Sequence, residues 1–422
     1  MLPADEPPLS FSKRAHRRRR SRAAVFALCA AALASPRPSF GQDAPDTASW
    51  FSFSSPKGKK PEAGAFVGDG ECSKCHRDKV TSYHRTAHFM TSSLPSEDTI
   101  HGSFKPGSDT LVTVNPNLYF LMEVNAKGYF QTANMRTSPT VVMTRSERID
   151  VVVGSGRKGQ SYLFWDGDLL FQLPVSYWTE LDGWVNSPGY VDGNADFERP
   201  IGPRCLECHA GRFENQPPPI NRYATSGMVL GITCERCHGP GGRHVALFGA
   251  NATRQTQAES AIVNPATLSR ARQLDICGQC HEGPGTSVTP PLSFAPGESL
   301  DQYLVFAKLD PGARVDVHAS QVQLLKRSRC FRSSSTMTCA TCHDVHTPQR
   351  DLAAFSSLCL KCHKVESCRA LPRLGHAIDG RCVECHMPLQ QTVQIISRVN
   401  GASVRPKVRN HQIAIYSEST PP

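Results

Sequence analysis

The chain has 422 residues, of which 39% are hydrophobic and 20% charged, and its formal net charge is +10. The hydrophobic fraction is below the ~45–50% usual for globular domains, and a mean hydropathy of −0.35 excludes a polytopic membrane protein. Residues 1–42 carry +6 of the charge, so the remaining chain is only weakly basic at +4. That distribution gives little support to a nucleic-acid partner.

The N-terminal segment combines a basic run at 13–22 with an apolar run at 23–34. This apolar run is too short to span a bilayer, which takes about 20 residues. A basic start, a short apolar stretch and then Ser, Pro and Gly are typical of a secretory signal peptide. We therefore expect residues 1–42 to be a signal peptide for periplasmic or exported localisation, with a basic disordered tail as the alternative. Residues 43–65 are rich in Pro, Ser, Gly and Lys and predict a flexible linker.

Fourteen of the 17 cysteines fall in seven copies of the pattern Cys-x-x-Cys-His, numbered here motifs 1 to 7 in chain order. The cysteine pairs are Cys72 and Cys75, Cys205 and Cys208, Cys234 and Cys237, Cys277 and Cys280, Cys339 and Cys342, Cys359 and Cys362, and Cys382 and Cys385. The histidines that follow them are His76, His209, His238, His281, His343, His363 and His386.

Three kinds of chemistry use paired cysteines at this spacing. Zinc ribbons do not require a histidine after every second cysteine, and a thioredoxin-like redox motif normally occurs once. The remaining interpretation is covalent c-type haem. Two thiols three positions apart lie on one side of a helical turn, where they can add to both vinyl groups of one porphyrin, and the adjacent imidazole becomes the proximal iron ligand. The sequence thus predicts seven covalently bound haem c groups.

The chain between the motifs is uneven. Residues 66–103 form a first haem segment, and residues 104–180 predict a β-rich insertion, with strands expected at 110–114, 118–124, 129–134, 149–153, 160–165 and 169–173. Residues 181–390 hold the other six motifs in short helices and loops, and residues 391–422 are expected to be a C-terminal tail. The expected fold is a mainly α and irregular multihaem cytochrome c with a β-rich insertion between the first and second motifs.

Each iron has a sixth position for a distal ligand. The candidates are His88, His244, His346, His318, His376 and His101, whereas His84 and His411 are expected to be surface or core histidines. Met90, Met337 and Met387 are weaker alternatives. Two cysteines outside the motifs, Cys330 and Cys368, could form a disulfide, remain as buried thiols or ligate a haem.

Several of these segments resemble the multihaem cytochrome c superfamily, in particular proteins with the cytochrome c-554 type haem domain. Cys234 to His244 is similar to the family element C-x-x-C-H-G-P-G-x-x-H, Cys339 to His346 to C-x-x-C-H-x-x-H, and Cys382 to Pro388 to the ending C-x-x-C-H-M-P. The opening segment from Cys72 to His88 also resembles the family. The wider group includes electron carriers, nitrite reductases and hydroxylamine oxidoreductases, and the Lys-ligated C-x-x-C-K motif that marks some catalytic members does not occur in this sequence.

Two functions follow from these observations. The first is an exported heptahaem cytochrome that transfers electrons along mostly bis-His, low-potential haems, with redox proteins or quinol-linked donors as partners and no required membrane association. The second is a multihaem oxidoreductase that acts on a small nitrogen or sulfur oxyanion at one open haem. A non-redox binding role for the β-rich insertion is a third, weaker possibility.

Overall fold

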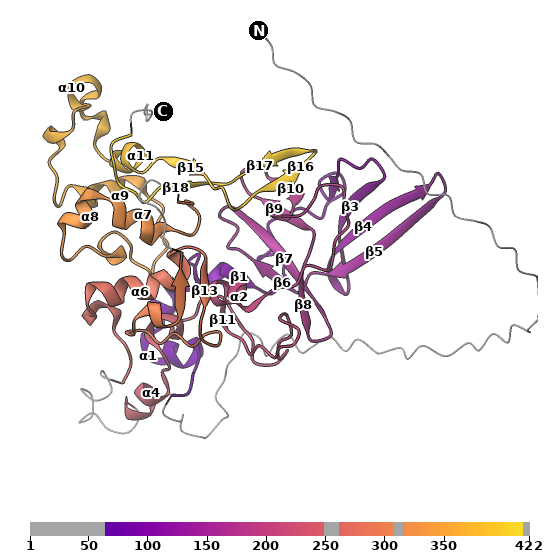
Figure 1. The fold of residues 1–422 in the computed structure, drawn as a ribbon, viewed down its shortest axis with the longest axis horizontal. Helices are drawn as coiled ribbons and strands as arrows, with labels where there is room; N and C mark the ends of the chain where they lie inside the picture. The colour runs from indigo at the N-terminus through magenta and orange to yellow at the C-terminus, as the bar shows by residue number, and fades with distance from the viewer. Residues whose placement is uncertain (1–63, 249–260, 308–314, 417–422) are drawn as a thin grey trace, which may run out of the picture. The chain divides into compact units, whose positions relative to one another are not determined.

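Strands and helices occupy different stretches of the chain (Figure 1). The computed structural model describes residues 64–248, 261–307 and 315–416. The expected signal peptide lies outside these residues, as does nearly all of the expected linker. No helix within the described ranges is long and apolar enough to cross a membrane.

The β-rich region contains two antiparallel sheets. One has four strands in the order β2-β3-β4-β5, and the other has the order β1-β6-β7-β9-β10 with β8 paired to β7. Their bounds are β1 Ser92–Ser93, β2 Thr110–Val112, β3 Leu118–Asn125, β4 Gly128–Ser138, β5 Val141–Arg148, β6 Val151–Val153, β7 Gly159–Asp166, β8 Leu169–Gln172, β9 Val175–Trp178 and β10 Gly183–Asn186. Tight turns join β3 to β4 and β7 to β8: Asn125 pairs with Gly128, and Asp166 pairs with Leu169 across a connection in which Gly167 has a φ of 62°.

Four of these strands were not expected from the sequence: the two-residue β1, and β5, β9 and β10. Strand β5 is exposed along most of its length, and all four residues of β9 are buried. Neither strand therefore shows the alternation of buried and exposed residues that marks a half-buried strand. The strand β10 pairs with β9 and extends the β-rich region to Asn186, beyond the expected boundary at 180.

The helices are short and carry the motifs. Their bounds are α1 Asp69–Tyr83, α2 Pro203–His209, α3 Glu235–His238, α4 Gly242–Phe248, α6 Arg270–His281, α7 Gln321–Arg327, α8 Arg329–Ser333, α9 Leu352–Cys359, α10 Leu371–Leu374 and α11 Cys382–His386. Local caps explain several of their starts. Ser269 accepts a hydrogen bond from the backbone of Arg272 at the start of α6, Asp351 accepts one from Ala353 at the start of α9, and Pro203 begins α2.

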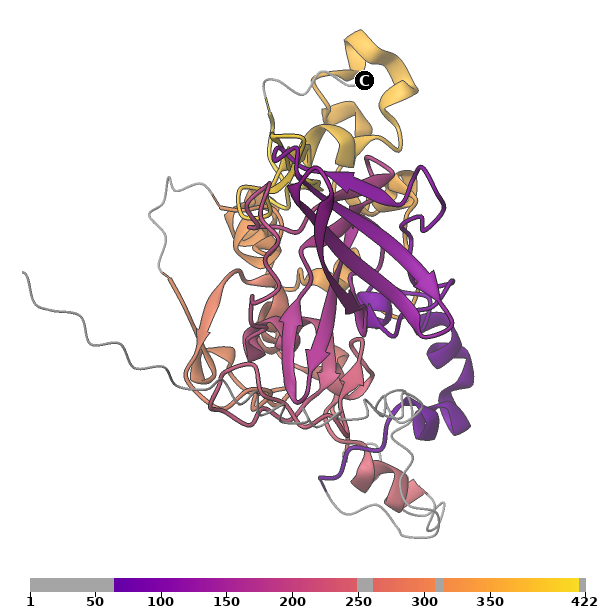
Figure 2. The same ribbon diagram turned by 90° about the vertical axis from the view of Figure 1, so that its right-hand side faces the viewer.

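Small hairpins join the remaining segments. Their strands are β11 Ala210–Arg212 with β12 Val229–Leu230, β13 Gly285–Ser287 with β14 Leu304–Phe306, β15 Leu389–Gln391 with β18 Lys407–Arg409, and β16 Ser397–Val399 with β17 Ala402–Val404. The last four strands occupy the expected tail, which is ordered by the β-rich region: the Asn186 side chain donates to Arg398 O at 3.1 Å, and Gly401 N donates to Asp192 at 2.8 Å. Figure 1 shows the yellow β16 and β17 beside β10, and Figure 2 shows the yellow C-terminal strands next to the magenta strands of the β-rich region.

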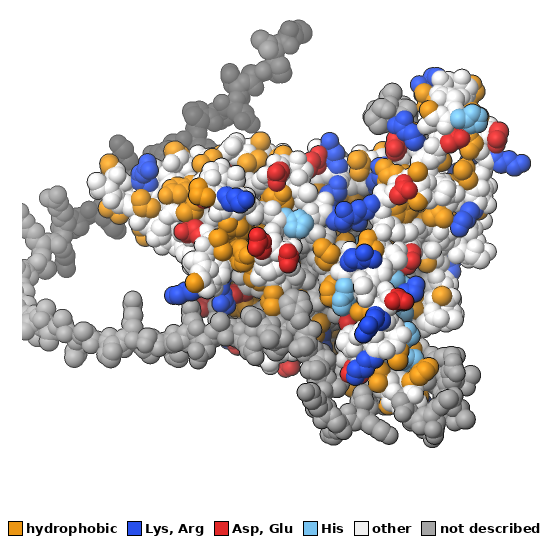
Figure 3. All heavy atoms as spheres, turned by 180° about the vertical axis from the view of Figure 1, so that it is seen from behind, with side chains coloured by type: hydrophobic (Ala, Val, Ile, Leu, Met, Phe, Trp, Pro, Cys, Tyr) orange, Lys and Arg blue, Asp and Glu red, His pale blue; other side chains and the backbone are white. Residues whose placement is uncertain are grey.

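Two apolar cores involve the sheets, and the second of them also joins the sheets to motif 2. The larger core lies within the sheets and includes Phe120, Tyr162 and Trp184. The second packs Val151, Leu163 and Leu170 of β6, β7 and β8 against Leu206 of motif 2. The described residues fall within one compact unit, and on the face seen in Figure 3 the acidic and basic side chains are interspersed. The β-rich region therefore supports motif 2 directly.

Candidate haem-binding sites

A single helical turn carries the reactive groups of each of three motifs. In motifs 3, 5 and 6 the backbone N–H of the histidine donates to the carbonyl of the first cysteine, at 3.1, 2.9 and 2.9 Å. This i to i−4 bond holds two thiols and one imidazole on the same turn, as the spacing predicts. All fourteen motif cysteines are free thiols in the structure, so both sulfurs of each motif are available for thioether formation.

Hydrogen bonds to Nδ1 orient four of the proximal imidazoles. His238 Nδ1 lies 2.9 Å from Val263 O, His386 Nδ1 lies 2.8 Å from Ala414 O, and His281 Nδ1 lies 3.0 Å from the Gln321 side-chain oxygen. His209 Nδ1 lies 2.9 Å from the Thr91 hydroxyl. A carbonyl oxygen can only accept, so Nδ1 carries the proton and Nε2 keeps its lone pair for a metal. The imidazoles of His238, His281 and His386 are thus held in the tautomer that a haem iron requires.

Four of the proximal histidines face a second histidine from a distant segment. The ring centroids are 6.4 Å apart for His76 and His244, 6.0 Å for His238 and His346, 6.3 Å for His343 and His411, and 6.1 Å for His281 and His88. The corresponding interplanar angles are 23°, 26°, 31° and 81°.

This separation is the one that two axial ligands need. With a metal–imidazole bond of about 2 Å and a nitrogen about 1.1 Å from its ring centre, two imidazoles on opposite sides of one iron have centroids roughly 6.3 Å apart. All four pairs lie within a few tenths of an ångström of that value. The histidines of motifs 1, 3, 4 and 5 therefore fit bis-His haems.

Burial favours the neutral form of several of the paired imidazoles. It lowers the pKa of His88 to about 4, helped by the nearby His281 and His343, and it lowers the pKa of His411 to about 4. Burial also lowers the pKa values of His281 and His343. Only a neutral imidazole can bind a metal, so burial favours the protonation state that these histidines need in order to bind iron.

The segment that carries His88 is fixed by the strand that leads into motif 3. Ile232 N donates to His88 O at 3.0 Å, and the Tyr83 hydroxyl donates to Ile232 O at 2.7 Å. Gly231 has a φ of 71°, and a Cβ at this position would collide with Phe89 O. Glycine is therefore required for the close approach that places His88 opposite His281.

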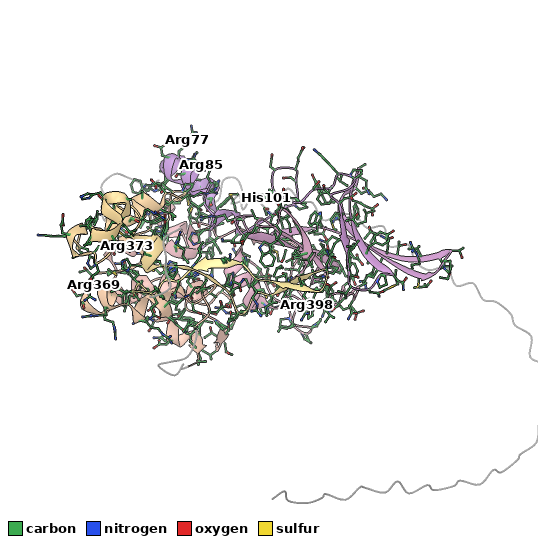
Figure 4. The ribbon with its side chains drawn as sticks, turned by 90° about the horizontal axis from the view of Figure 1, so that it is seen from above. Arg77, Arg85, His101, Arg369, Arg373 and Arg398 are labelled. Carbon is green, nitrogen blue, oxygen red and sulfur yellow. The ribbon has the colours of Figure 1, made fainter. Side chains whose placement is uncertain are left out.

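The other candidate histidines are placed differently. His318 lies near the buried His209: burial lowers the pKa of His209, and the neighbouring His318 lowers it further. His376 is 79% exposed in its side chain and bonds to Asp379 at 3.1 Å. The His101 ring lies 6.4 Å from the Tyr177 ring of β9, and Figure 4 shows His101 among the strands of the β-rich region. His84 bonds to Asp69 at 3.0 Å and stacks on Phe89.

His411 is the one histidine in a ring pair that sequence reasoning placed on the surface or in the core. It is held near α8 because Ser328 bonds to both His411 O and Ile413 N, at 3.2 and 2.7 Å. Its own Nδ1 lies 3.1 Å from Arg409 O. No sequence motif surrounds His411, so only the path of the C-terminal strands could reveal its position.

Motifs 1 and 3 are held together by reciprocal contacts. The buried Glu235 carboxylate of motif 3 accepts from Val67 N and Gly68 N, both at 2.9 Å, just before α1, and from Gly241 N at 2.8 Å. In return, Asp69 at the start of α1 accepts from Cys234 N at 3.1 Å. Each helix start is thus satisfied by a carboxylate from the other motif.

The later motifs also contact one another in space, in the order in which they occur along the chain. Cys277 of motif 4 and Cys339 of motif 5 pack against one apolar cluster. His343 of motif 5 lies 5.2 Å from the Phe355 ring of α9, and α9 packs on α11, where Val383 N donates to the Ser356 hydroxyl at 3.3 Å. The motifs therefore form a continuous series through the described part of the chain.

The arrangement does not fit zinc ribbons. Within the described residues, no group of three or more His, Cys, Asp or Glu side chains converges on a possible metal position. A structural zinc ion needs four such ligands, whereas a porphyrin supplies four nitrogens itself and needs only two axial ligands. Cys330 and Cys368 are both free thiols, so the structure does not contain the disulfide considered for them.

Comparisons with known proteins agree with this geometry. Residues 190–239, which include motifs 2 and 3, match the family model described as cytochrome c554 and c-prime. A search of the curated proteins finds no match. The outer cell wall cytochrome OcwA has a similar fold, with a TM-score of 0.51 and 16% identity over 82% of this chain and 79% of that one. An undecahaem cytochrome from the S-layer of Carboxydothermus ferrireducens aligns with a TM-score of 0.39 and 16% identity, over 85% of this chain and 53% of that one. The motif geometry, the family match and the OcwA-like fold together support a multihaem c-type cytochrome.

Proposed function

We propose that this protein is an exported heptahaem cytochrome that transfers electrons through a series of closely spaced haems, most of them with two histidine ligands. One observation carries the proposal. Four histidines from distant segments have ring centroids about 6 Å from those of proximal histidines. Bound haem supplies one-electron chemistry at iron. The chain attaches each haem, fixes its axial ligands and buries it.

The distal histidines cross between motifs. His244 follows motif 3 and faces His76 of motif 1, and His346 follows motif 5 and faces His238 of motif 3. His88 follows motif 1 and faces His281 of motif 4. A segment that binds one haem thus also ligates its neighbour. This arrangement holds neighbouring haems at fixed separations, which electron transfer between them requires.

Export is part of the proposal. Thioether formation takes place outside the cytoplasm, and the sequence predicts a signal peptide. OcwA, whose fold this chain resembles, is described as an outer cell wall cytochrome. We propose redox proteins or quinol-linked donors as partners.

The haem count is tested by the intact mass of the mature protein together with its pyridine haemochrome spectrum. We expect seven haems per chain and a mass that places signal cleavage near residue 42. A colourless exported protein, or one with zinc in place of iron, would contradict the proposal.

The ligand assignment is tested by His244→Ala, with His101→Ala as a matched control. We expect the first variant to convert one low-spin ferric haem to a high-spin form in the electron paramagnetic resonance spectrum. The control removes a histidine from the β-rich region and should leave the spectrum unchanged. Identical spectra for both variants would remove His244 from the ligand set.

A second candidate function is supported by motifs 6 and 7. Among the described residues, which include every histidine after residue 42, no second histidine ring contacts His363 or His386. An iron with a single protein ligand could bind a small nitrogen or sulfur oxyanion, as in a multihaem oxidoreductase. A high-spin ferric signal that changes on adding nitrite or cyanide would support this function, and wholly low-spin spectra would exclude it.

A further inference from the structure

The second variable residues of motifs 2, 3 and 4 meet in one buried polar junction. Arg236 of motif 3 donates through Nη2 to Glu207 O of motif 2 at 2.9 Å and to the Gln279 side-chain oxygen of motif 4 at 2.6 Å. Gln279 also donates from Nε2 to Ile276 O at 2.8 Å. We call Glu207, Arg236 and Gln279 the motif junction. It connects three haem-binding turns that are far apart in the sequence.

The positive charge in the motif junction has no carboxylate against it. Arg236 is only 9% exposed, and its acceptors are a backbone carbonyl and an amide oxygen. The Glu207 carboxylate accepts from Arg204 at 3.2 Å, Ser287 at 3.2 Å and Leu292 N at 3.0 Å. Arg204 also donates to Gln279 O at 2.8 Å, so the two guanidinium groups leave a net positive charge beside this one carboxylate. Of the described residues, none bonds to the buried Arg236 Nε. A buried cation with only neutral partners acts over a longer range than a paired or exposed one.

The charge lies beside the cysteines of all three motifs. Cys280 of motif 4 contacts Glu207 O at 3.9 Å, the same carbonyl oxygen that accepts from Arg236. Arg236 immediately precedes Cys237, and its two acceptors belong to Glu207 and Gln279, which immediately precede Cys208 and Cys280. One cysteine of each of the three motifs is therefore next in sequence to a residue of the motif junction.

We propose that Arg236 is a shared tuning residue that raises the reduction potentials of the haems held by motifs 2, 3 and 4 above those held by motifs 6 and 7. This inference rests on the proposed function. Reduction of a ferric haem adds one electron to its site and makes the site more negative by one charge. A fixed, buried positive charge stabilises that reduced state more than the oxidised one. Electrons entering from either end of the series would then collect at the motif junction.

The primary test compares Arg236→Gln with Arg236→Lys in the full holoprotein. Glutamine keeps a hydrogen-bond donor and removes the charge. Lysine keeps the charge but lacks the planar guanidinium group with its several N–H donors. Spectroscopic redox titration should show a downward shift in the midpoint potentials of up to three of the seven haems in Arg236→Gln. Arg236→Lys should keep potentials close to those of the unmodified protein.

Two further variants keep the test decisive if Arg236→Gln does not fold. Gln279→Glu places a carboxylate against Arg236 and should lower the same potentials with the arginine still present. Arg272→Gln is the matched control, because Arg272 lies on α6 with motif 4, pairs with Asp275 at 2.6 Å and is 35% exposed in its side chain. We expect it to shift the potentials much less.

Three outcomes would overturn the inference: unchanged potentials in both Arg236→Gln and Gln279→Glu, equal shifts in the glutamine and lysine variants, or a shift spread evenly over all haems. These outcomes are distinguishable from failure of the proposed function. That failure would appear in the unmodified protein as a haem count other than seven or as an absence of reversible one-electron steps.

Discussion

Motifs 2 to 4 and motifs 6 and 7 have the same sequence pattern but different surroundings. In motifs 2, 3 and 4 the second variable residue is buried and joins the motif junction. In motif 6 the corresponding residue, Lys361, is exposed, as are Cys362 and His363. Figure 4 shows Arg369 and Arg373 on the segment that follows motif 6. A Cys-x-x-Cys-His motif therefore defines the attachment of a haem, whereas the residues between its cysteines decide how the haem site is held and tuned.

The histidines available as distal ligands also differ between motifs 3 and 4 and the last motifs. The histidines of motifs 3 and 4 face His346 and His88, which lie in segments anchored by several backbone hydrogen bonds. The segment after motif 6 contains His376, but this side chain is exposed and bonded to Asp379. We therefore propose that the interlocked motifs pass electrons between fixed haems and that the two last motifs exchange electrons with a partner or bind a small ligand.

The largest effect is expected from Glu235→Gln, which tests the connection between motifs 1 and 3. The Glu235 carboxylate is 5% exposed and accepts from three backbone N–H groups. Replacing a charged acceptor of this kind should reduce the free energy of unfolding by about 2–3 kcal/mol. Urea unfolding of the holoprotein measures the change. Glu366→Gln, at an exposed site, is the control, and an equally small effect of both would show that the contact contributes little.

A smaller, local effect is expected from His88→Ala in the haem site of motif 4. The variant should turn one of the seven haems from low-spin to high-spin, because the described structure places no other imidazole opposite His281. His84→Ala removes a histidine four residues earlier and should leave the electron paramagnetic resonance spectrum intact. A spin change in the control alone would reverse the assignment of the two residues.

The smallest effect is expected from His376→Ala. Because His376 points to solvent and Asp379, its loss should change neither the spin state of any ferric haem nor the number of haems that bind carbon monoxide after reduction. A new high-spin signal would show that this ring turns inward once haem is attached. That result would remove the contrast between the distal sides of the inner and the last motifs.

The sequence alone predicts the chemistry of attachment. Thiols three positions apart with an adjacent imidazole can be recognised without a structure, because one helical turn brings them together. The turns at Asn125 and Gly167 and the strands on either side of them also follow from local patterns. The exposed edge strand β5 and the fully buried β9 do not, since neither alternates between polar and apolar residues.

Only the tertiary structure decided which histidine faces which motif and which charges lie between the motifs. His411 has no local signal, yet it lies 6.3 Å from His343 because C-terminal strands bring it there. His101 was a candidate distal ligand from the sequence, but its ring packs beside Tyr177 of the β-rich region. Likewise, Arg236 reads as an ordinary polar residue within its motif, and the approach of Glu207 and Gln279 turns it into a buried cation. Attachment depends on neighbours along the chain, whereas axial pairing and electrostatic tuning depend on neighbours in space.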